Sequence, residues 1–264
     1  MLAGLALLSL CIAAHAADTD RERILSHGPW PPAVEKRDSA ALGERLFFDP
    51  ALSGTGSILC ATCHVPYKSF QDGKPLAFGL GEADRNTPTL INVAFYRRFG
   101  WDGGRDSLAK QSIRPMLEPR EMGSSPARIA SVGRKFGFSG NDDAVIAEVG
   151  KALAAYQETL VSGRTPFDDF RDGKRTASYP EAAQRGLRVF VAECSSCHAG
   201  PQFTNSAIVN GFRVPGLRNV ALTAPYMHDG HVATLEEAAA HTGSKEGKDL
   251  AAFLRTLTES SQLQ

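Results

Sequence analysis

The sequence contains two copies of the pattern Cys-x-x-Cys-His, formed by Cys60, Cys63 and His64 and by Cys194, Cys197 and His198. In this pattern the two thiols can each form a thioether with a vinyl group of haem, and the histidine can bind the iron. Zinc ribbons also use cysteine pairs, but their two pairs lie within roughly 15–20 residues. Here the pairs lie in opposite halves of the chain. The sequence therefore predicts two covalently attached c-type haems, with His64 and His198 as proximal ligands.

The first sixteen residues are typical of a secretory signal peptide. Residues 1–16 form an apolar run that ends in Ala14-His15-Ala16, a small-x-small cleavage pattern, and the run is too short to span a bilayer. It has no Lys or Arg, which leaves open a first helix of the mature fold. Cys11 would be lost with this segment, and the other four cysteines belong to the haem motifs. An exported di-haem protein without disulfides suits a bacterial periplasm.

The charge balance limits the partners of this chain. Lys and Arg number 29 and Asp and Glu number 29, so the formal net charge is zero. Nucleic acids and anionic membranes attract basic surfaces. We therefore expect neither as a partner, and no membrane insertion after signal cleavage.

Apolar residues recur at helical spacing along much of the chain. The spacing predicts helices at residues 40–48, 107–116, 125–136, 142–161, 181–193, 235–241 and 248–258, and a short helix near 20–25. Residues 65–86 are rich in Gly and Pro and are expected to loop over a haem edge. Because no strong strand pattern is present, the predicted fold class is mostly α, with two cytochrome c-like haem domains.

A polar stretch punctuated by Gly and Pro, residues 162–180, is the predicted domain boundary. After the signal peptide, we place an N-terminal haem domain with its arm at residues 17–165 and a C-terminal haem domain at 166–264. In both halves a helix precedes the Cys-x-x-Cys-His pattern and a loop rich in Gly or Pro follows it. This internal echo indicates two related domains.

Further segments resemble the bacterial di-haem cytochrome c peroxidase and MauG family. They are Trp101–Arg105, Gln111, Pro115, Glu121–Gly123, Val214–Asn219 and Thr223–Gly230, in the family's order across nearly the whole mature chain. The resemblance implies a two-domain fold of c-type haem modules. It also implies reaction with hydrogen peroxide at the N-terminal haem and electron transfer at the C-terminal haem.

The resemblance makes Glu121 the acid-base group of the peroxide reaction. Cleavage of the O–O bond needs a group that takes a proton from one oxygen and returns it to the other, and a carboxylate beside an apolar haem pocket can do this. The local sequence alone favours a surface glutamate paired with Arg114 or Arg120. The resemblance also places Gln111 and Pro115 in the distal pocket.

Four more residues take a role from the resemblance. Trp101 matches the electron relay between the two haems, although the local sequence alone favours an ordinary core or turn tryptophan. Asn86, Thr223 and Pro225 match positions that bind Ca²⁺ between the domains through side-chain and backbone oxygens. Without the resemblance they are turn residues.

Two positions depart from the peroxidase pattern. Many members close the N-terminal haem at rest with a histidine after the first motif, where this sequence has Leu80. We therefore expect that haem to be five-coordinate or water-bound, without a need for reductive activation. Where peroxidases have a methionine and MauG a tyrosine as far ligand of the C-terminal haem, this sequence has Thr242. The neighbouring His241 is the preferred ligand, with Met227 or an open site as alternatives.

Both departures favour the MauG side of the family, whose members oxidise residues of a partner protein. We expect a periplasmic enzyme in which peroxide reacts at the His64 haem and oxidising equivalents, shared through Trp101, withdraw electrons from a partner protein. One alternative is a cytochrome c peroxidase that takes electrons from a small cytochrome or cupredoxin. A non-catalytic di-haem carrier is the other, but a carrier gains nothing from a vacant coordination site.

Overall fold

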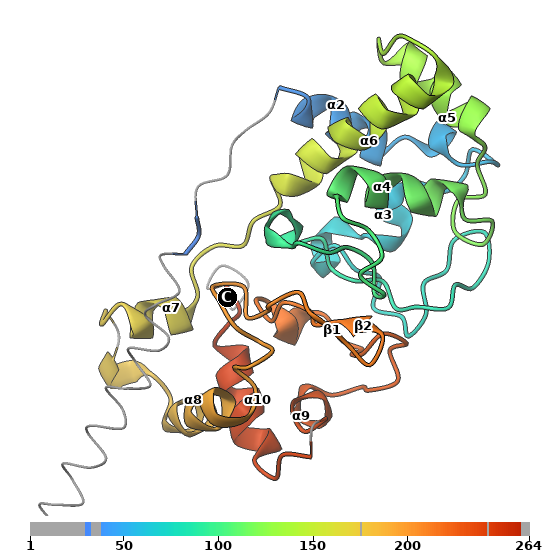
Figure 1. Cartoon of the computed structure of the whole chain (residues 1–264). Helices are drawn as coiled ribbons and strands as arrows, with labels where there is room; N and C mark the ends of the chain where they lie inside the picture. The colour runs from blue at the N-terminus through green and yellow to red at the C-terminus, as the bar shows by residue number, and fades with distance from the viewer. Residues whose placement is uncertain (1–29, 33–37, 175, 242, 260–264) are drawn as a thin grey trace, which may run out of the picture.

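The computed structural model describes residues 30–32, 38–174, 176–241 and 243–259 (Figure 1). The predicted signal peptide, the helix predicted near residues 20–25 and Thr242 lie outside the described residues. Helices dominate the described chain, which confirms the mostly α fold class. None of these helices combines the length and the apolar character needed to cross a bilayer.

The longer helices are α2 (Ala40–Phe47), α4 (Leu108–Leu117), α5 (Pro126–Lys135), α6 (Asp142–Glu158), α8 (Glu181–Glu193) and α10 (Gly247–Arg255). The short elements are α3 (Cys60–Cys63), α7 (Pro166–Arg171), α9 (Leu235–Ala239) and the antiparallel hairpin of β1 (Ile208–Val209) and β2 (Phe212–Arg213). Every helix predicted within the described residues is present, although several end early. For example, α6 stops at Glu158, and the carbonyl of Leu160 instead accepts the backbone N–H of Asn92 at 2.7 Å.

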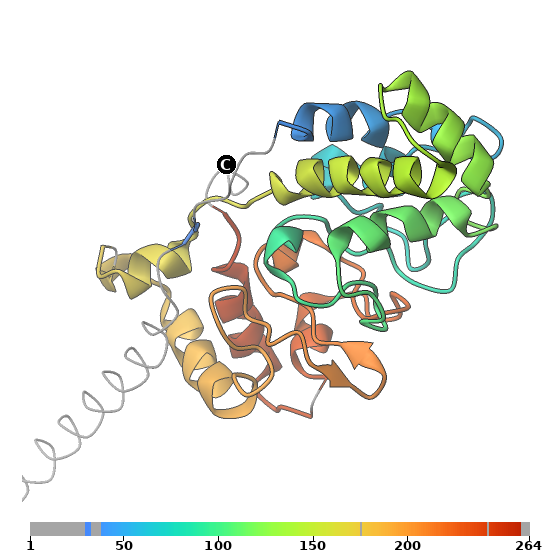
Figure 2. The same ribbon diagram turned by 45° about the horizontal axis from the view of Figure 1, so that its top comes forward.

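Helix α6 lies at the centre of the N-terminal half, in contact with α2, α4 and α5 (Figure 2). The side chain of Asn141 caps it by accepting the N–H of Ala144 at 2.9 Å. Helix α2 approaches α6 closely because Gly43 has no side chain: a Cβ there would lie 1.8 Å from the carbonyl oxygen of Ala152. The core that results includes Leu46, Phe47, Met116, Ile129 and Leu153.

The C-terminal half is built on the crossing of α8 and α10, with α9 beside α10. At the crossing, a Cβ on Gly186 would lie 1.8 Å from the carbonyl oxygen of Asp249, so only glycine allows this approach. Rings of Phe167, Phe190, Phe203 and Phe253 pack against one another there. Because α8 ends at Glu193, it delivers Cys194 to the edge of this aromatic core.

The two halves have separate apolar cores. One core takes its buried residues from positions 46–156 and the other from positions 167–257. The chain passes between them at residues 159–165, beside the predicted boundary (Figure 1). The division into domains at 17–165 and 166–264 remains a prediction.

A buried ion pair holds the start of the C-terminal half. Thr165 and Asp168 cap the N-terminus of α7 reciprocally. Both carboxylate oxygens of Asp168 accept hydrogen bonds from the guanidinium of Arg218 at 2.9 Å, and the two side chains are 0% and 1% exposed. Arg218 also donates to the carbonyl of Pro201 at 2.6 Å. The pair therefore ties α7 to the loop that follows the second haem motif.

The carboxylate of Asp172, just after α7, gives a testable pH dependence. Arg171 Nε and Arg164 Nη2 donate to it at 2.8 and 2.6 Å. The hydrogen bond from Arg171, then that from Arg164, lowers the pKa of Asp172 from 3.8 to about 2. Since the folded-state pKa is the lower one, this stabilisation is present above about pH 4 and is lost as the pH falls toward 2.

We expect Asp172→Asn to lower the free energy of unfolding at pH 7 by about 1 kcal/mol or less, because solvent screens this partly exposed group. Near pH 2 the substitution should have little effect. Thermal unfolding of the haem-loaded protein at both pH values measures the difference, with Glu44→Gln on the exposed face of α2 as control. Equal destabilisation at both pH values would contradict the assignment.

Candidate active site

The first haem motif lies on a single helical turn. Helix α3 carries Cys60 and Cys63 at its ends, and His64 follows directly. The Nδ1–H of His64 donates to the carbonyl of Phe70 at 3.0 Å, which fixes the ring and leaves Nε2 to bind metal. Burial lowers the pKa of His64, against the opposing effect of this hydrogen bond. The imidazole is therefore neutral, as iron binding requires.

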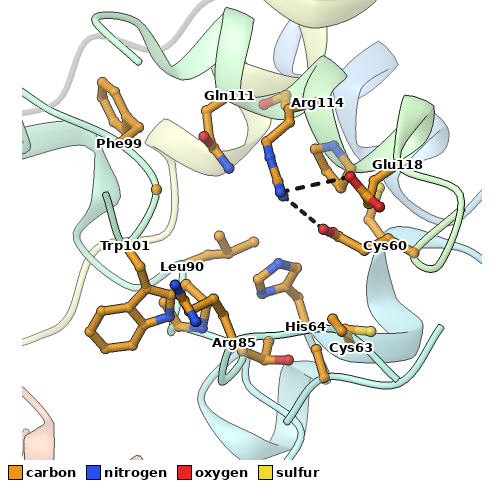
Figure 3. A pocket seen from close by; sticks show the side chains of 18 of the residues that line it. Cys60, Cys63, His64, Arg85, Leu90, Phe99, Trp101, Gln111, Arg114 and Glu118 are labelled. Carbon is orange, nitrogen blue, oxygen red and sulfur yellow. Dashed lines mark hydrogen bonds and ion pairs between the residues drawn. The ribbon is translucent and has the colours of Figure 1, made fainter. Parts of the chain in front are cut away.

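These motif residues line a cavity of about 360 Å³ whose walls include Leu90 and Phe99 (Figure 3). Both cysteines are unbridged. Burial raises the pKa of Cys60 to about 12 and that of Cys63 to about 11, whereas metal-binding and redox-active thiols have lowered pKa values. Two neutral thiols and a histidine on one cavity fit a covalently attached haem.

Helix α4 forms the opposite side of this cavity. Figure 3 shows Gln111 and Arg114 across the cavity from His64. Gln111 and Pro115 lie one helical turn apart and both line the cavity, as does Glu121 beyond the end of the helix. The Oε1 atom of Gln111 is buried and accepts no hydrogen bond from the described residues. It is therefore available to a molecule bound in the cavity.

Glu121 lines the cavity and also forms an ion pair. Its Oε1 accepts a hydrogen bond from Arg114 Nη1 at 2.7 Å, and Arg114 lies 4.0 Å from Glu118 (dashed lines in Figure 3). Arg120 instead pairs with Asp84. The pairing with Arg114 that the local sequence favours is thus present, but it does not remove Glu121 from the cavity. Arg114 orients the carboxylate there.

Two glycine-bearing loops fix the backbone of the Glu121 turn. Gly54 N–H donates to the carbonyl of Met122 at 2.8 Å, and Leu80 N–H donates to that of Glu121 at 3.0 Å. A Cβ on Gly79 would lie 2.2 Å from the Glu121 carbonyl oxygen, so the loop can approach only with glycine there. The Leu80 side chain is 39% exposed and is not part of the cavity wall.

Trp101 stands where the two halves meet. Its indole N–H donates to the carbonyl of Asn86 at 2.8 Å, and its own carbonyl accepts the backbone N–H of Arg213 at 2.7 Å. The backbone N–H of Asn86 in turn donates to the carbonyl of His228 at 2.8 Å. Trp101 therefore touches both the cavity and the C-terminal half. Its role as a relay remains a prediction.

The predicted calcium residues come from two segments that lie close together. His228, which bonds Asn86, follows Thr223 and Pro225 by only a few residues. The Asn86 amide donates to the carbonyl of Lys74, and the Thr223 hydroxyl donates to that of Val220. The predicted residues offer neutral side-chain and backbone oxygens, which are among the ligands that Ca²⁺ takes in proteins. A calcium ion remains a proposal.

The second motif repeats the arrangement of the first. Cys194 and Cys197 are unbridged, and His198 Nδ1–H donates to the carbonyl of Phe203 at 2.9 Å. Burial lowers the pKa of His198, and the charge of His241 lowers it further.

The far ligand of the second haem remains untested. His241 lies in the turn after α9, where its Nδ1–H donates to the carbonyl of Ala238 at 2.8 Å and leaves Nε2 free of that bond. Met227 has a positive φ of 73° and is half-buried. His241 as the far ligand, with Met227 or an open site as alternatives, remains a prediction.

Sequence reasoning missed two arginines and a tryptophan. The local sequence predicts Arg114 only as a surface partner of Glu121 and predicts no role for Arg213, yet both line the first cavity. Trp30 falls in the predicted extended arm but is buried, with the Arg218 guanidinium 4.0 Å from its ring centre. Local sequence carries no signal for these long-range contacts. The one available hint is that Arg213 directly precedes the family-like segment Val214–Asn219.

The glycines beside Glu121 give a matched pair of variants. We expect Gly79→Ala to cost about 1–3 kcal/mol of unfolding free energy, because the new methyl group meets a fixed carbonyl. Gly81→Ala should change it by about 0.5 kcal/mol or less, since its Cβ would meet only Arg120 side-chain atoms at 3.7 Å or more. Urea unfolding of the haem-loaded variants measures both. Equal effects would show that the approach of Gly79 does not hold the turn.

Comparison with known proteins identifies the family. Residues 37–176 match the family model of the di-haem cytochrome c peroxidases. The methylamine utilization protein MauG of Methylorubrum extorquens is 33% identical, over 83% of this chain and 78% of that protein. The cytochrome c551 peroxidase of Nitrosomonas europaea is 31% identical, over 85% of this chain and 81% of that protein.

A solved structure shares the whole fold. The crystal structure of a MauG-like protein associated with microbial copper homeostasis superimposes with a TM-score of 0.72 and 26% identity, covering 90% of this chain and 95% of that one. Together with the sequence matches, it confirms the predicted family. The chain therefore belongs to the di-haem cytochrome c peroxidase and MauG family of haem-dependent oxidoreductases, which carry two c-type haems.

Proposed function

We propose that this protein is a periplasmic MauG-like enzyme that uses hydrogen peroxide to oxidise a residue of a partner protein. The haem held by Cys60, Cys63 and His64 supplies the site at which peroxide is reduced. Cys194, Cys197 and His198 would hold the second haem, which would supply electron transfer from the partner. The predicted signal peptide at residues 1–16 supports the periplasmic location.

The observation that carries the proposal is the lining of the first cavity. Within the described chain, His64 is the single histidine in that lining. Leu80, at the position where many members have a closing histidine, is fixed by its N–H to the Glu121 carbonyl, with its side chain outside the cavity wall. Peroxide therefore has no second histidine to displace before it binds, and activation by prior reduction is unnecessary.

The residues opposite His64 supply the proton chemistry. Glu121 takes a proton from one peroxide oxygen and returns it to the leaving oxygen. Arg114 orients the carboxylate through its 2.7 Å hydrogen bond. The unpartnered Oε1 of Gln111 accepts a hydrogen bond from peroxide O–H, and Pro115 shapes the wall beside it.

The route to the second haem runs through the interface between the halves. Trp101 bridges the halves through Asn86 and Arg213, which supports a role as electron relay. His241 is the proposed far ligand of the second haem. A histidine there in place of methionine would favour the ferric state of the haem. The haem would then be a poor acceptor of electrons from ordinary small cytochromes.

The alternative function is a cytochrome c peroxidase that oxidises a small cytochrome or a cupredoxin. The 31% identity to a cytochrome c551 peroxidase favours it as much as similar identities to MauG proteins favour the proposal. Steady-state assays with reduced horse-heart-type cytochrome c and with a reduced cupredoxin separate the two. We expect slow turnover with both donors, at a rate that prior reduction of the enzyme does not raise. Rapid turnover after reduction would establish the alternative.

The role of Glu121 has a matched control beside it. We expect Glu121→Gln to slow the reaction of the resting enzyme with peroxide by about 10²–10⁴-fold, because the amide cannot transfer the proton. Glu118→Gln alters a second cavity-lining carboxylate, which lies farther from Arg114. It should slow the reaction by less than about tenfold.

Stopped-flow absorbance at the haem bands, with equal haem content in all proteins, measures these rates. Equal rates for wild type and Glu121→Gln would rule out the acid-base role. An unchanged haem spectrum after peroxide addition to wild type would instead favour a plain electron carrier.

A further inference from the structure

Arg213, in strand β2 of the C-terminal half, is a buried cation without a carboxylate partner in the described chain. It is 6% exposed, yet it lines the cavity of the first haem motif. Among the described residues its guanidinium donates to the carbonyls of Gly100 and Val214, at 3.3 and 3.4 Å, and it lies 4.4 Å from the ring centre of Tyr96. These contacts are long and neutral, so they leave its charge uncompensated.

Arg218, five residues later, shows how this fold otherwise treats a buried arginine. It is 4% exposed and binds both oxygens of Asp168 at 2.9 Å. A guanidinium fits a carboxylate in this two-bond geometry, and the pairing offsets the cost of removing the charge from water. Arg213 has no such carboxylate partner among the described residues, in contrast to Arg218.

The carboxylates around the cavity have other partners. Glu121 pairs with Arg114, Asp84 pairs with Arg120, and Asp102 accepts the backbone N–H of Gly104. No carboxylate in the described cavity lining forms an ion pair with Arg213, so a ligand bound in the cavity can supply the anion. A c-type haem carries two propionate groups, and each is a carboxylate suited to this guanidinium.

We propose that Arg213 binds a propionate of the haem attached to Cys60 and Cys63. The C-terminal half thereby supplies the counter-ion for the haem of the N-terminal half. The proposal rests on haem attachment at the first motif and is independent of which molecule the enzyme oxidises. Because the backbone N–H of Arg213 also donates to the carbonyl of Trp101, one strand holds both the haem edge and the tryptophan.

The test is the reduction potential of each haem in the full-length di-haem protein. Removing the cation leaves more negative charge near the first iron, which favours the ferric form. We expect Arg213→Gln to lower the equilibrium constant for reduction of the N-terminal haem about tenfold or more. This corresponds to a fall in its reduction potential of about 59 mV for one electron. Arg213→Lys keeps the positive charge but cannot donate two parallel hydrogen bonds to one carboxylate. Its reduction potential should therefore fall too, but by less.

The control is Arg85→Gln. Arg85 also lines this cavity but is exposed, so solvent already screens its charge and the shift should be well under tenfold. Potentiometric titration followed by visible absorption and EPR assigns each potential to its haem. If Arg213→Gln incorporates too little haem, Arg213→Lys and Arg85→Gln decide the question alone.

Two results would overturn the proposal. An unchanged N-terminal potential in both Arg213 variants would mean that no propionate is bound there. A shift confined to the C-terminal haem would mean that Arg213 serves the other cofactor. Neither result depends on peroxide reactivity, so failure here is distinguishable from failure of the proposed function.

Discussion

The N-terminal half keeps a cavity for a cofactor that its own side chains do not fill. The rest of the structure depends on keeping this cavity open. Helix α3 presents two thiols and His64 to a cavity, and α4 and the following turn present Gln111, Arg114 and Glu121 from the other side. The turn keeps its place because glycine-bearing loops approach its backbone more closely than a Cβ would permit. The reactive geometry thus depends on backbone packing as much as on the acidic side chain.

Much of the fold could be predicted because its helices carry a regular apolar spacing, as in α6 and α8. Their ends were less certain, because caps and long-range bonds such as Asn92 to Leu160 decide them. The two-residue strands of the hairpin are too short to leave a pattern. The haem motifs were predictable from chemistry. Gln111, Pro115 and Glu121 could be placed in one pocket only through family resemblance, since no local pattern links a helix to a turn beyond it.

Hydrogen bonds to backbone carbonyls connect the halves, and sequence patterns did not reveal them. Arg218 and Asp168 form a closed pair inside the C-terminal half, whereas Arg213 directs an uncompensated charge toward the cavity of the N-terminal half. Trp101 links the two halves by hydrogen bonds. Its indole N–H donates to the carbonyl of Asn86, and its own carbonyl accepts the backbone N–H of Arg213. An enzyme that shares oxidising equivalents between two haems needs such a contact to keep their separation constant.

The central claim is that the first haem is open at rest. Low-temperature EPR of the resting diferric protein tests it directly, comparing wild type with His241→Ala before and after one equivalent of peroxide. The account predicts one high-spin and one low-spin signal, loss of the low-spin signal in the variant, and disappearance of both wild-type signals with peroxide. Two low-spin signals at rest would contradict it, because a ligand would then close the first haem and the reductively activated peroxidase would be the better description.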